Sequence, residues 1–155
     1  MQPALVEQLK DIFPGIVDVQ SSTYGRVSPY LDHQNVYVES SVDNDIEILV
    51  NLLRDQVLKE SSAATQEGET PRAVIVFCDN KTKLNKICEE LQNANIISLP
   101  FNDNTKQISL KMRYRTLNLF NDGQVPVLVS DNLGARGLDT MNVSHVIQFE
   151  YAKSA

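Results

Sequence analysis

The sequence predicts an α/β fold in which helices cover both faces of a parallel sheet, giving three layers. From residue 72 onward, short apolar runs of strand length alternate with longer segments whose apolar residues recur every three or four positions. The first run is rich in valine and isoleucine and lacks polar alternation, which is typical of a strand buried on both faces. Strand, helix, strand, helix and strand in this order indicate right-handed βαβ units.

The first third of the chain predicts fewer elements. An amphipathic helix is expected at residues 3–12, followed by a short extended run at 16–19 and a polar linker at 21–30. Residues 35–40, NVYVES, alternate apolar and polar side chains, and this alternation predicts a half-buried strand.

A second helix is expected from Asp43, because the apolar spacing changes there to the helical period. The residues that follow this period are Ile46, Leu49, Val50, Leu53, Val57 and Leu58. Either Asp43 or Asp45 can cap this helix. Residues 61–71 are small, polar and acidic, without periodicity, and they predict an exposed loop.

The second part of the chain supplies the sheet and its connections. Strands are expected at residues 73–78, 96–100 and 125–130, and a fourth from residue 145 onward. Helices are expected at residues 81–94 and 110–123, the second of them ended by Gly123. The first of these helices has an apolar face made of Leu84, Ile87, Cys88 and Leu91.

Composition limits the class of protein. The chain has 155 residues, 42% of them hydrophobic, which fits one ordinary domain with its own core. No apolar run approaches the roughly 20 residues that cross a bilayer, and the N-terminus predicts no signal peptide.

Cys78 and Cys88 do not have the spacing of a disulfide framework, so we expect reduced, buried thiols. His33 and His145 are isolated from other ligands, so no metal site is expected.

Charge is unevenly distributed along the chain. The net charge of −6 argues against a protein that coats nucleic acid by bulk electrostatics. Residues 1–70 hold 4 Lys/Arg against 12 Asp/Glu, a net charge of −8, whereas residues 71–155 hold 10 against 8, a net charge of +2. A local basic patch is therefore expected in the second part, from Lys106, Lys111, Arg113 and Arg115.

The segment 130–140, SDNLGARGLDT, follows the third strand of the predicted sheet. We expect it at the carboxyl ends of the strands, where ligands gather in parallel sheets. Gly134 and Gly137 allow close approach of the backbone to a ligand. Arg136 can bind a phosphate, and Asp139 can accept hydrogen bonds from a sugar diol. The segment alone also fits a tight turn in which the arginine pairs with a neighbouring aspartate.

Several motifs that would complete a catalytic site are missing from the sequence. There is no GxxxxGK[ST] loop for phosphates, no acid pair at a strand end for Mg²⁺, and no arrangement that resembles a catalytic triad. No catalytic residue is therefore assigned, and any chemistry must be shared with groups outside this chain.

Taken in order, these segments resemble the second RecA-like domain of DEAD-box ATP-dependent RNA helicases. VIVFCDN (74–80) resembles the fourth motif of that family, and LVSDNLGARGLDT (128–140) resembles the fifth. HVIQFEYAKSA (145–155) resembles the strand that leads into the sixth. The spacing of the family's QxxR region is matched by Arg113, Leu117, Phe120 and Gly123.

The resemblance implies a division of the chain. Residues 31–155 resemble the second RecA-like domain, incomplete at its C-terminus. Residues 1–30 resemble the last helix and strand of the preceding RecA-like domain, together with the linker. The arginine-rich sixth motif and the Walker-type motifs of the first domain are not within the sequence.

The resemblance also implies a composite binding site. The residues implied to bind ATP are Gly137, Asp139 and Arg136, with Asp139 at the ribose. The residues implied to bind the RNA backbone are Asn80, Arg113, Ser130, Asp131 and Gly134. Phe77 is implied to support the arginine-bearing sixth motif by stacking on it.

The chain departs from the family's pattern within these motifs. Asp131-Asn132 stands where the fifth motif usually has Thr-Asp, and Asn80 stands where the fourth usually has Thr. Leu110 replaces the Gln of QxxR, and Leu99-Pro100-Phe101 replaces the usual LHG. These departures indicate a divergent member.

The expected function is that of one lobe of an ATP-dependent RNA helicase, which binds ATP and RNA between two RecA-like lobes and remodels or unwinds RNA. Mg²⁺ ligands are expected from the first lobe, so this chain alone is expected to be inactive. The expected partners are RNA, ATP and that first lobe. The protein is expected to be a monomer that does not associate with a membrane. An intracellular location is expected, with cytoplasm, nucleus and mitochondrion left open. Two alternatives remain: a catalytically inactive interaction module, and another nucleotide-binding α/β domain.

Overall fold

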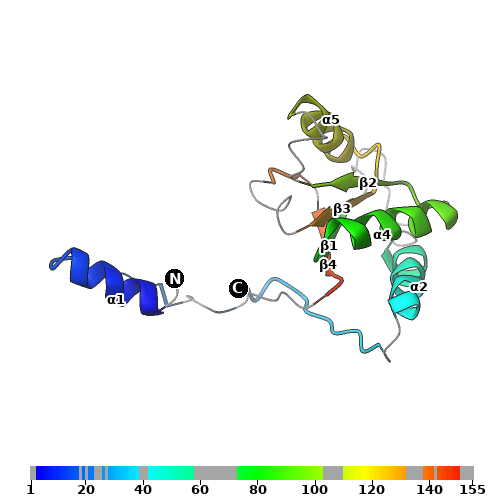
Figure 1. Ribbon diagram of the computed structural model, residues 1–155. Helices are drawn as coiled ribbons and strands as arrows, with labels where there is room; N and C mark the ends of the chain where they lie inside the picture. Colours follow the sequence, from blue (N-terminus) through cyan, green and yellow to red (C-terminus); the bar gives the residue numbers. More distant parts are fainter. Residues whose placement is uncertain are drawn as a thin grey trace. The chain divides into compact units, whose positions relative to one another are not determined.

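The chain forms two compact units, Met1–Tyr37 and Val38–Ala155. The computed structural model (Figure 1) describes residues 3–17, 19, 21–22, 26, 28–38, 42–57, 73–102, 110–131, 138–141 and 143–150. Among these residues, no helix combines the length and the apolar character that crossing a membrane requires.

The first unit contains helix α1, Pro3–Ile12, which confirms the helix predicted there. Phe13 and Gly15 close its end with turn hydrogen bonds, the amide of Phe13 lying 2.9 Å from the carbonyl oxygen of Leu9. The apolar side chains that follow are exposed, including those of Phe13, Ile16 and Val17.

The strand predicted at residues 35–40 is wrong for its described part. Residues 35–38 are not in a strand, and Tyr37 is 90% exposed; residues 39–40 lie outside the described residues. Alternation shows which side chains could face a core, but a strand also requires a neighbour that supplies backbone hydrogen bonds. Within the described residues, no strand pairs with this segment.

The second unit is built on a four-stranded sheet with the order β2-β3-β1-β4. Its strands are β1 (Ala73–Cys78), β2 (Ser98–Phe101), β3 (Val127–Asp131) and β4 (Val143–Gln148). All three pairings are parallel, which confirms the predicted fold class. The predicted strands are present, with ends shifted by up to two residues.

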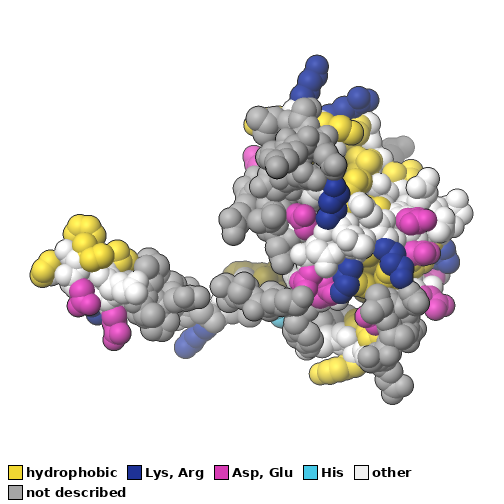
Figure 2. Space-filling view, in the orientation of Figure 1, with side chains coloured by type: hydrophobic (Ala, Val, Ile, Leu, Met, Phe, Trp, Pro, Cys, Tyr) yellow, Lys and Arg dark blue, Asp and Glu magenta, His cyan; other side chains and the backbone are white. Residues whose placement is uncertain are grey.

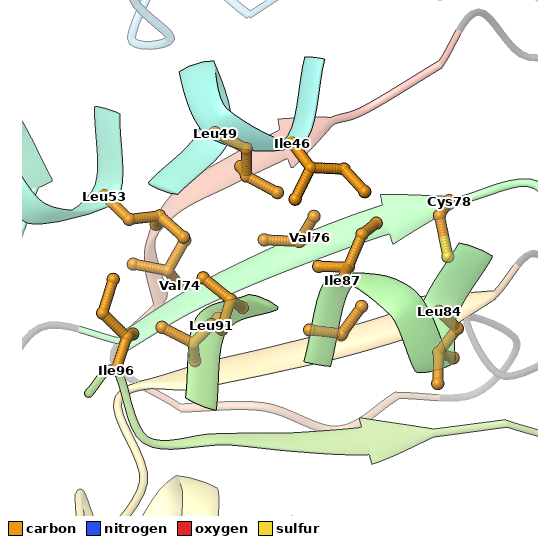
Figure 3. Close-up of a cluster of buried hydrophobic side chains, with 12 residues drawn as sticks. Ile46, Leu49, Leu53, Val74, Val76, Cys78, Leu84, Ile87, Leu91 and Ile96 are labelled. Atoms are coloured by element: carbon orange, nitrogen blue, oxygen red, sulfur yellow. The ribbon is translucent and has the colours of Figure 1, made fainter. Parts of the chain in front are cut away.

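Helices cover both faces of this sheet. The helical elements are α2 (Val42–Leu52), the π-helical turn η1 (Leu53–Val57), α4 (Lys81–Asn93) and α5 (Leu110–Asn121). On one face, α2, η1 and α4 pack against Val74, Val76, Val127 and Val129 (Figure 3). On the other, Phe120 and Leu117 of α5 pack with Ile75 and Leu128. Neighbouring residues of β1 and β3 therefore face opposite cores, which is why their sequences are apolar throughout.

Local signals explain where these helices begin and end. Asn80 caps α4, because its side-chain oxygen accepts a hydrogen bond from the amide of Lys83 at 3.1 Å. Gly123 follows α5 with a φ of 70°, the left-handed conformation expected of a C-terminal cap. The cap predicted for α2 is wrong: the helix begins at Val42, so Asp43 and Asp45 lie within its first turn.

The predicted core of the first part of this unit is confirmed. Ile46, Leu49 and Leu53 are buried against the sheet, as the helical spacing predicts. The side chains of Val57 and Leu58, and the loop predicted at residues 61–71, lie outside the described residues. Cys78 is buried and Cys88 is half-buried, and both are free thiols.

Candidate nucleotide and RNA site

The carboxyl ends of the strands lie side by side at one edge of the sheet. Cys78 at the end of β1 is in register with Asp131 at the end of β3, and Phe101 at the end of β2 is in register with Ser130. This is the edge at which ligands bind in open parallel sheets. Of the candidate residues, Phe77, Asn80, Ser130 and Asp131 are placed here.

Arg113 joins this edge from α5. Its guanidinium carbon lies 4.8 Å from the centroid of the Phe101 ring, a distance typical of a cation–π contact. Phe101 is 5% exposed, so the ring is a fixed platform for the guanidinium group. The planar guanidinium group keeps its hydrogen-bond donors at its rim when it stacks, which suits a phosphate ligand.

Helix α5 carries basic side chains on more than one side, since Lys111 and Arg115 are four residues apart and Arg113 is two residues from each. Lys111 and Arg115 are exposed on the same helix, whereas Arg113 is half-buried. Figure 2 shows Lys and Arg side chains projecting over α5 at the top of the view. The predicted patch is thus present for Lys111 and Arg115, while Arg113 lies on a different side of α5 and Lys106 lies outside the described part of the chain.

Ser130 and Asp131 turn their side chains away from solvent. Ser130 is fully buried, and its hydroxyl donates a hydrogen bond to the carbonyl oxygen of Asp131 at 3.1 Å. Asp131 is 9% exposed. Contact of Ser130 with a ligand in this conformation would therefore have to come from its backbone.

Cys78 ties the ends of β1 and β3 together. Its Sγ lies 3.6 Å from the carbonyl oxygen of Ser130 and 3.7 Å from that of Asn80. Burial, and then the negative charge of Asp131, raise the pKa of the Cys78 thiol to about 11. The neutral thiol is thus the stable form and can donate to these carbonyl groups.

Glu150 fastens the chain that follows β4 to the turn between β1 and α4. Its Oε2 accepts a hydrogen bond from the backbone amide of Asp79 at 2.9 Å, and its Oε1 forms an ion pair with Lys83. The amide of Phe149 donates to the carbonyl oxygen of Phe77 at 2.9 Å. Sequence reasoning missed Glu150 and its ion pair with Lys83; an acid just after a strand was the available signal.

Asp139 lies elsewhere than predicted. The segment of residues 138–141 runs beside the C-terminal end of α5, where the side chain of Asn121 binds it, and not at the carboxyl ends of the strands. The physical reason is topological. Since β4 is parallel to β3, the chain must cross back to the opposite edge of the sheet before β4 begins. The Asp139 side chain is exposed.

The remaining candidates differ in how the structure places them. Phe77 is half-buried and packs with the core cluster that contains Phe101. Gly134, Arg136 and Gly137 lie outside the described residues. Among the described residues, no three His, Cys, Asp or Glu side chains form a group that could hold a metal ion.

Comparison with known proteins identifies what this arrangement resembles. The family model described as "Helicase conserved C-terminal domain" matches residues 45–155. The DEAD-box ATP-dependent RNA helicase 22 of Oryza sativa subsp. japonica is 31% identical over 147 residues, which cover 95% of this chain and 24% of that protein. The chain thus spans about a quarter of the length of this curated relative.

Solved structures show the same fold. S. cerevisiae Dbp5 bound to RNA and ADP BeF3 matches with a TM-score of 0.71 and 18% identity, over 100% of this chain and 35% of that one. The C-terminal domain of the DEAD-box protein Dbp5 by itself matches with a TM-score of 0.58 and 19% identity, over 73% of this chain and 54% of that one. The longer Dbp5 structure therefore matches a part of this chain that the isolated domain does not.

Proposed function

Because the chain belongs to the family of helicase conserved C-terminal domains, as the C-terminal RecA-like domain of a DEAD-box helicase, we propose that it acts as the second lobe of an ATP-dependent RNA helicase. In this role it binds the RNA backbone and one side of ATP, and a first RecA-like lobe supplies the phosphate and Mg²⁺ ligands. Hydrolysis then switches the lobes between closed and open states and remodels the RNA.

The observation that carries this proposal is the arrangement along α5. Near its first turn, Arg113 stacks on Phe101 at the carboxyl edge of the sheet. At its last residue, Asn121 holds the backbone immediately after the exposed Asp139 side chain, at the carbonyl oxygen of Asp139 and the amide of Met141. The two positions are 8 residues apart, which is roughly 12 Å along a helix. Helix α5 thus supports both the Arg113 guanidinium group, which suits a phosphate, and the segment of Asp139, whose carboxylate suits a sugar.

The RNA contact is assigned to Arg113, Asn80 and the backbone at Ser130–Gly134. Guanidinium and backbone N–H groups read no bases, which suits RNA bound through its sugar-phosphate backbone. Among these, Asn80 already uses its side-chain oxygen as the cap of α4, so its remaining donor, the amide NH₂, is the group proposed to meet RNA.

The nucleotide contact is assigned to Asp139, with Gly137 and Arg136 beside it. A carboxylate accepts two hydrogen bonds from a ribose diol, and exposure leaves it accessible to a ligand. Phe77 is assigned the supporting role for an arginine of the sixth motif. Glu150 fastens the chain that leads toward that motif.

The first unit is assigned to the preceding lobe and the linker, over residues 1–30. Two observations support this assignment. The described residues of this range contribute no strand to the sheet, and the match to the longer Dbp5 structure extends over the whole chain. The first observation also disfavours a self-contained nucleotide-binding domain in which residues 1–30 would complete the sheet.

A second candidate function is a catalytically inactive interaction module with the same fold. One observation favours it: the carboxylate of Asp131 adds negative charge at the edge of the sheet where RNA phosphates would bind. Such a module would keep the fold and lose the RNA and ATP contacts.

Ultraviolet crosslinking of RNA, together with ATP binding, distinguishes the two candidates in a protein that joins this chain to a first RecA-like lobe. We expect Arg113→Ala to reduce RNA crosslinking and Asp139→Ala to weaken ATP binding on the order of tenfold, as for loss of a charged hydrogen bond. Arg115→Ala, two residues along α5 and therefore on a different side of the helix, is the matched control for charge. If the unaltered protein neither crosslinks RNA nor binds ATP, the interaction module is the better assignment.

A further inference from the structure

The side chain of Asn121 binds the backbone on the C-terminal side of Asp139, at the two peptide groups that flank Thr140. Its Nδ2 donates a hydrogen bond to the carbonyl oxygen of Asp139 at 3.2 Å. Its Oδ1 accepts one from the amide of Met141 at 3.1 Å. Both ends of a single amide are thus used to hold one short segment.

This segment has few other constraints among the described residues. Residues 138–141 belong to no helix or strand, so they lack the regular hydrogen bonds that would fix their backbone. Leu138 is anchored, because it packs against the core cluster that contains Phe120 and Leu128. Asp139 therefore lies between a core anchor on one side and the Asn121 amide on the other, while its own side chain is exposed.

Asn121 itself sits on a rigid base. It is the last residue of α5, and Phe120 beside it is 1% exposed. Gly123 closes the helix immediately afterwards, its amide lying 3.0 Å from the carbonyl oxygen of Phe120. The position of Asn121 is thus set by the core of the second unit.

We propose that Asn121 is a positioning residue for the recognition of the nucleotide ribose: by fixing the backbone at Asp139 and Met141, it aims the Asp139 carboxylate at the ribose hydroxyl groups. The inference rests on the proposed function, which places ATP at Asp139. Its physical reason is preorganisation. A carboxylate that must meet two hydroxyl groups loses affinity if its backbone has to be ordered during binding.

A purely structural role for Asn121 predicts a different outcome. Losing the two hydrogen bonds would then lower stability and weaken every nucleotide equally. A positioning role predicts that the loss falls on the ribose hydroxyl groups. The ratio of the dissociation constants of 2′,3′-dideoxy-ATP and ATP separates these outcomes, because the first nucleotide lacks both hydroxyl groups.

The test measures both dissociation constants in the full two-lobe protein, by competition with a fluorescent nucleotide. We expect Asn121→Ala to weaken ATP binding about three- to tenfold, as for loss of one or two net hydrogen bonds, and to leave binding of 2′,3′-dideoxy-ATP unchanged. Asn121→Asp keeps the oxygen that accepts from Met141 but places a second acceptor oxygen against the carbonyl oxygen of Asp139, so an effect at least as large as that of Asn121→Ala is expected. Asn118→Ala, one turn earlier on the exposed side of α5, is the matched control and should change neither constant.

The outcomes separate the inference from the proposed function. If Asp139→Ala lowers the dideoxy-ATP to ATP ratio but Asn121→Ala and Asn121→Asp do not, the positioning role is wrong and the nucleotide assignment stands. If Asp139→Ala also leaves the ratio unchanged, the nucleotide assignment fails and the inference fails with it. Thermal unfolding of each variant shows whether a weaker affinity reflects unfolding, and equal weakening of both nucleotides overturns the positioning role.

Discussion

Two buried side chains with polar atoms, those of Cys78 and Ser130, lie at the ends of β1 and β3. The thiol of Cys78 bridges two carbonyl groups, and Ser130 satisfies its hydroxyl group within the backbone of its own strand. Both residues are fully buried, and each has a hydrogen-bond partner there, as burial requires. Of these two residues, Ser130 is also one that the family resemblance implies to bind the RNA backbone.

The two thiols predict a loss of stability at high pH. Burial is the main cause that raises the pKa of both Cys78 and Cys88 from 9.0 to about 11. The folded state therefore holds these protons more tightly than the unfolded state. Their contribution to stability is complete below pH 9 and is lost as the pH rises through about 11. Urea unfolding between pH 8 and 11 measures this loss.

A variant without thiols is the control for the other groups that titrate in this range. In Cys78→Ala/Cys88→Ala, the free energy of unfolding should be lower at pH 8 and should fall less steeply with pH. The same slope in the variant and in the unaltered protein would show that the thiols are not responsible.

Glu150 should contribute to stability through both of its interactions. Glu150→Gln keeps an oxygen for the amide of Asp79 but loses the ion pair with Lys83. The side chains of Glu150 and Lys83 are 17% and 33% exposed. We therefore expect Glu150→Gln to lower the free energy of unfolding by about 1 kcal/mol, more than for the loss of an exposed pair. Lys83→Met and the double variant complete a cycle that isolates the pair. A coupling energy near zero would contradict the role assigned to this ion pair.

Among the helical elements, α5 connects the two halves of the proposed site. Its start lies near the carboxyl ends of the strands, and its end lies near the edge where β3 and β4 begin. Arg113 and Asn121 thus act at opposite ends of one helix, and Leu117 and Phe120 between them pack on the core. A movement of α5 as a rigid body would shift both contacts together.

The stacking platform of Arg113 predicts an effect on RNA without any change in charge. Phe101→Leu removes the aromatic face and keeps an apolar residue at the end of β2. We expect weaker RNA binding, by a factor of about two to five, since a cation–π contact contributes about 0.5–1 kcal/mol. Fluorescence anisotropy with a labelled single-stranded RNA measures the change.

The matched control for this variant is Phe120→Leu. It removes a ring from the same core cluster but not from Arg113. Equal losses of RNA affinity in the two variants would indicate general destabilisation and would contradict the platform role of Phe101.

Local sequence patterns predicted a helix well where the residues of that helix alone determine its buried face or its end. The apolar face of Leu84, Ile87 and Leu91 is buried as expected, and Gly123 ends α5. The segment at residues 35–38 shows the limit, because its alternation could not reveal whether a neighbouring strand exists. The Asn121 amide and the Glu150 carboxylate were missed for a related reason. Each meets backbone groups at least 18 residues away, which no local spacing encodes.

At the scale of the whole molecule, the chain divides into two units with separate internal contacts. Both buried clusters draw their residues from Val38–Ala155 alone. The location of Asp139 is also determined by the topology of the whole sheet. Its place beside α5 follows from the parallel pairing of β3 and β4 through β1, and not from the motif in which it occurs.

Removal of the first unit should leave the second folded. A chain of residues 38–155 keeps the described residues of both core clusters, so we expect the same cooperative thermal transition within a few degrees. Circular dichroism of the two chains measures it. A large drop in melting temperature, or loss of the cooperative transition, would show that residues 1–37 are part of the same folding unit.

RNA-stimulated ATP hydrolysis tests the central claim most directly. It should be measured on this chain alone and on a protein that joins it to a first RecA-like lobe. We expect no turnover above background for the chain alone, and hydrolysis that RNA stimulates when both lobes are present. RNA-stimulated turnover by the 155-residue chain itself, or no turnover with both lobes, would contradict the role of this chain as the second lobe of a helicase.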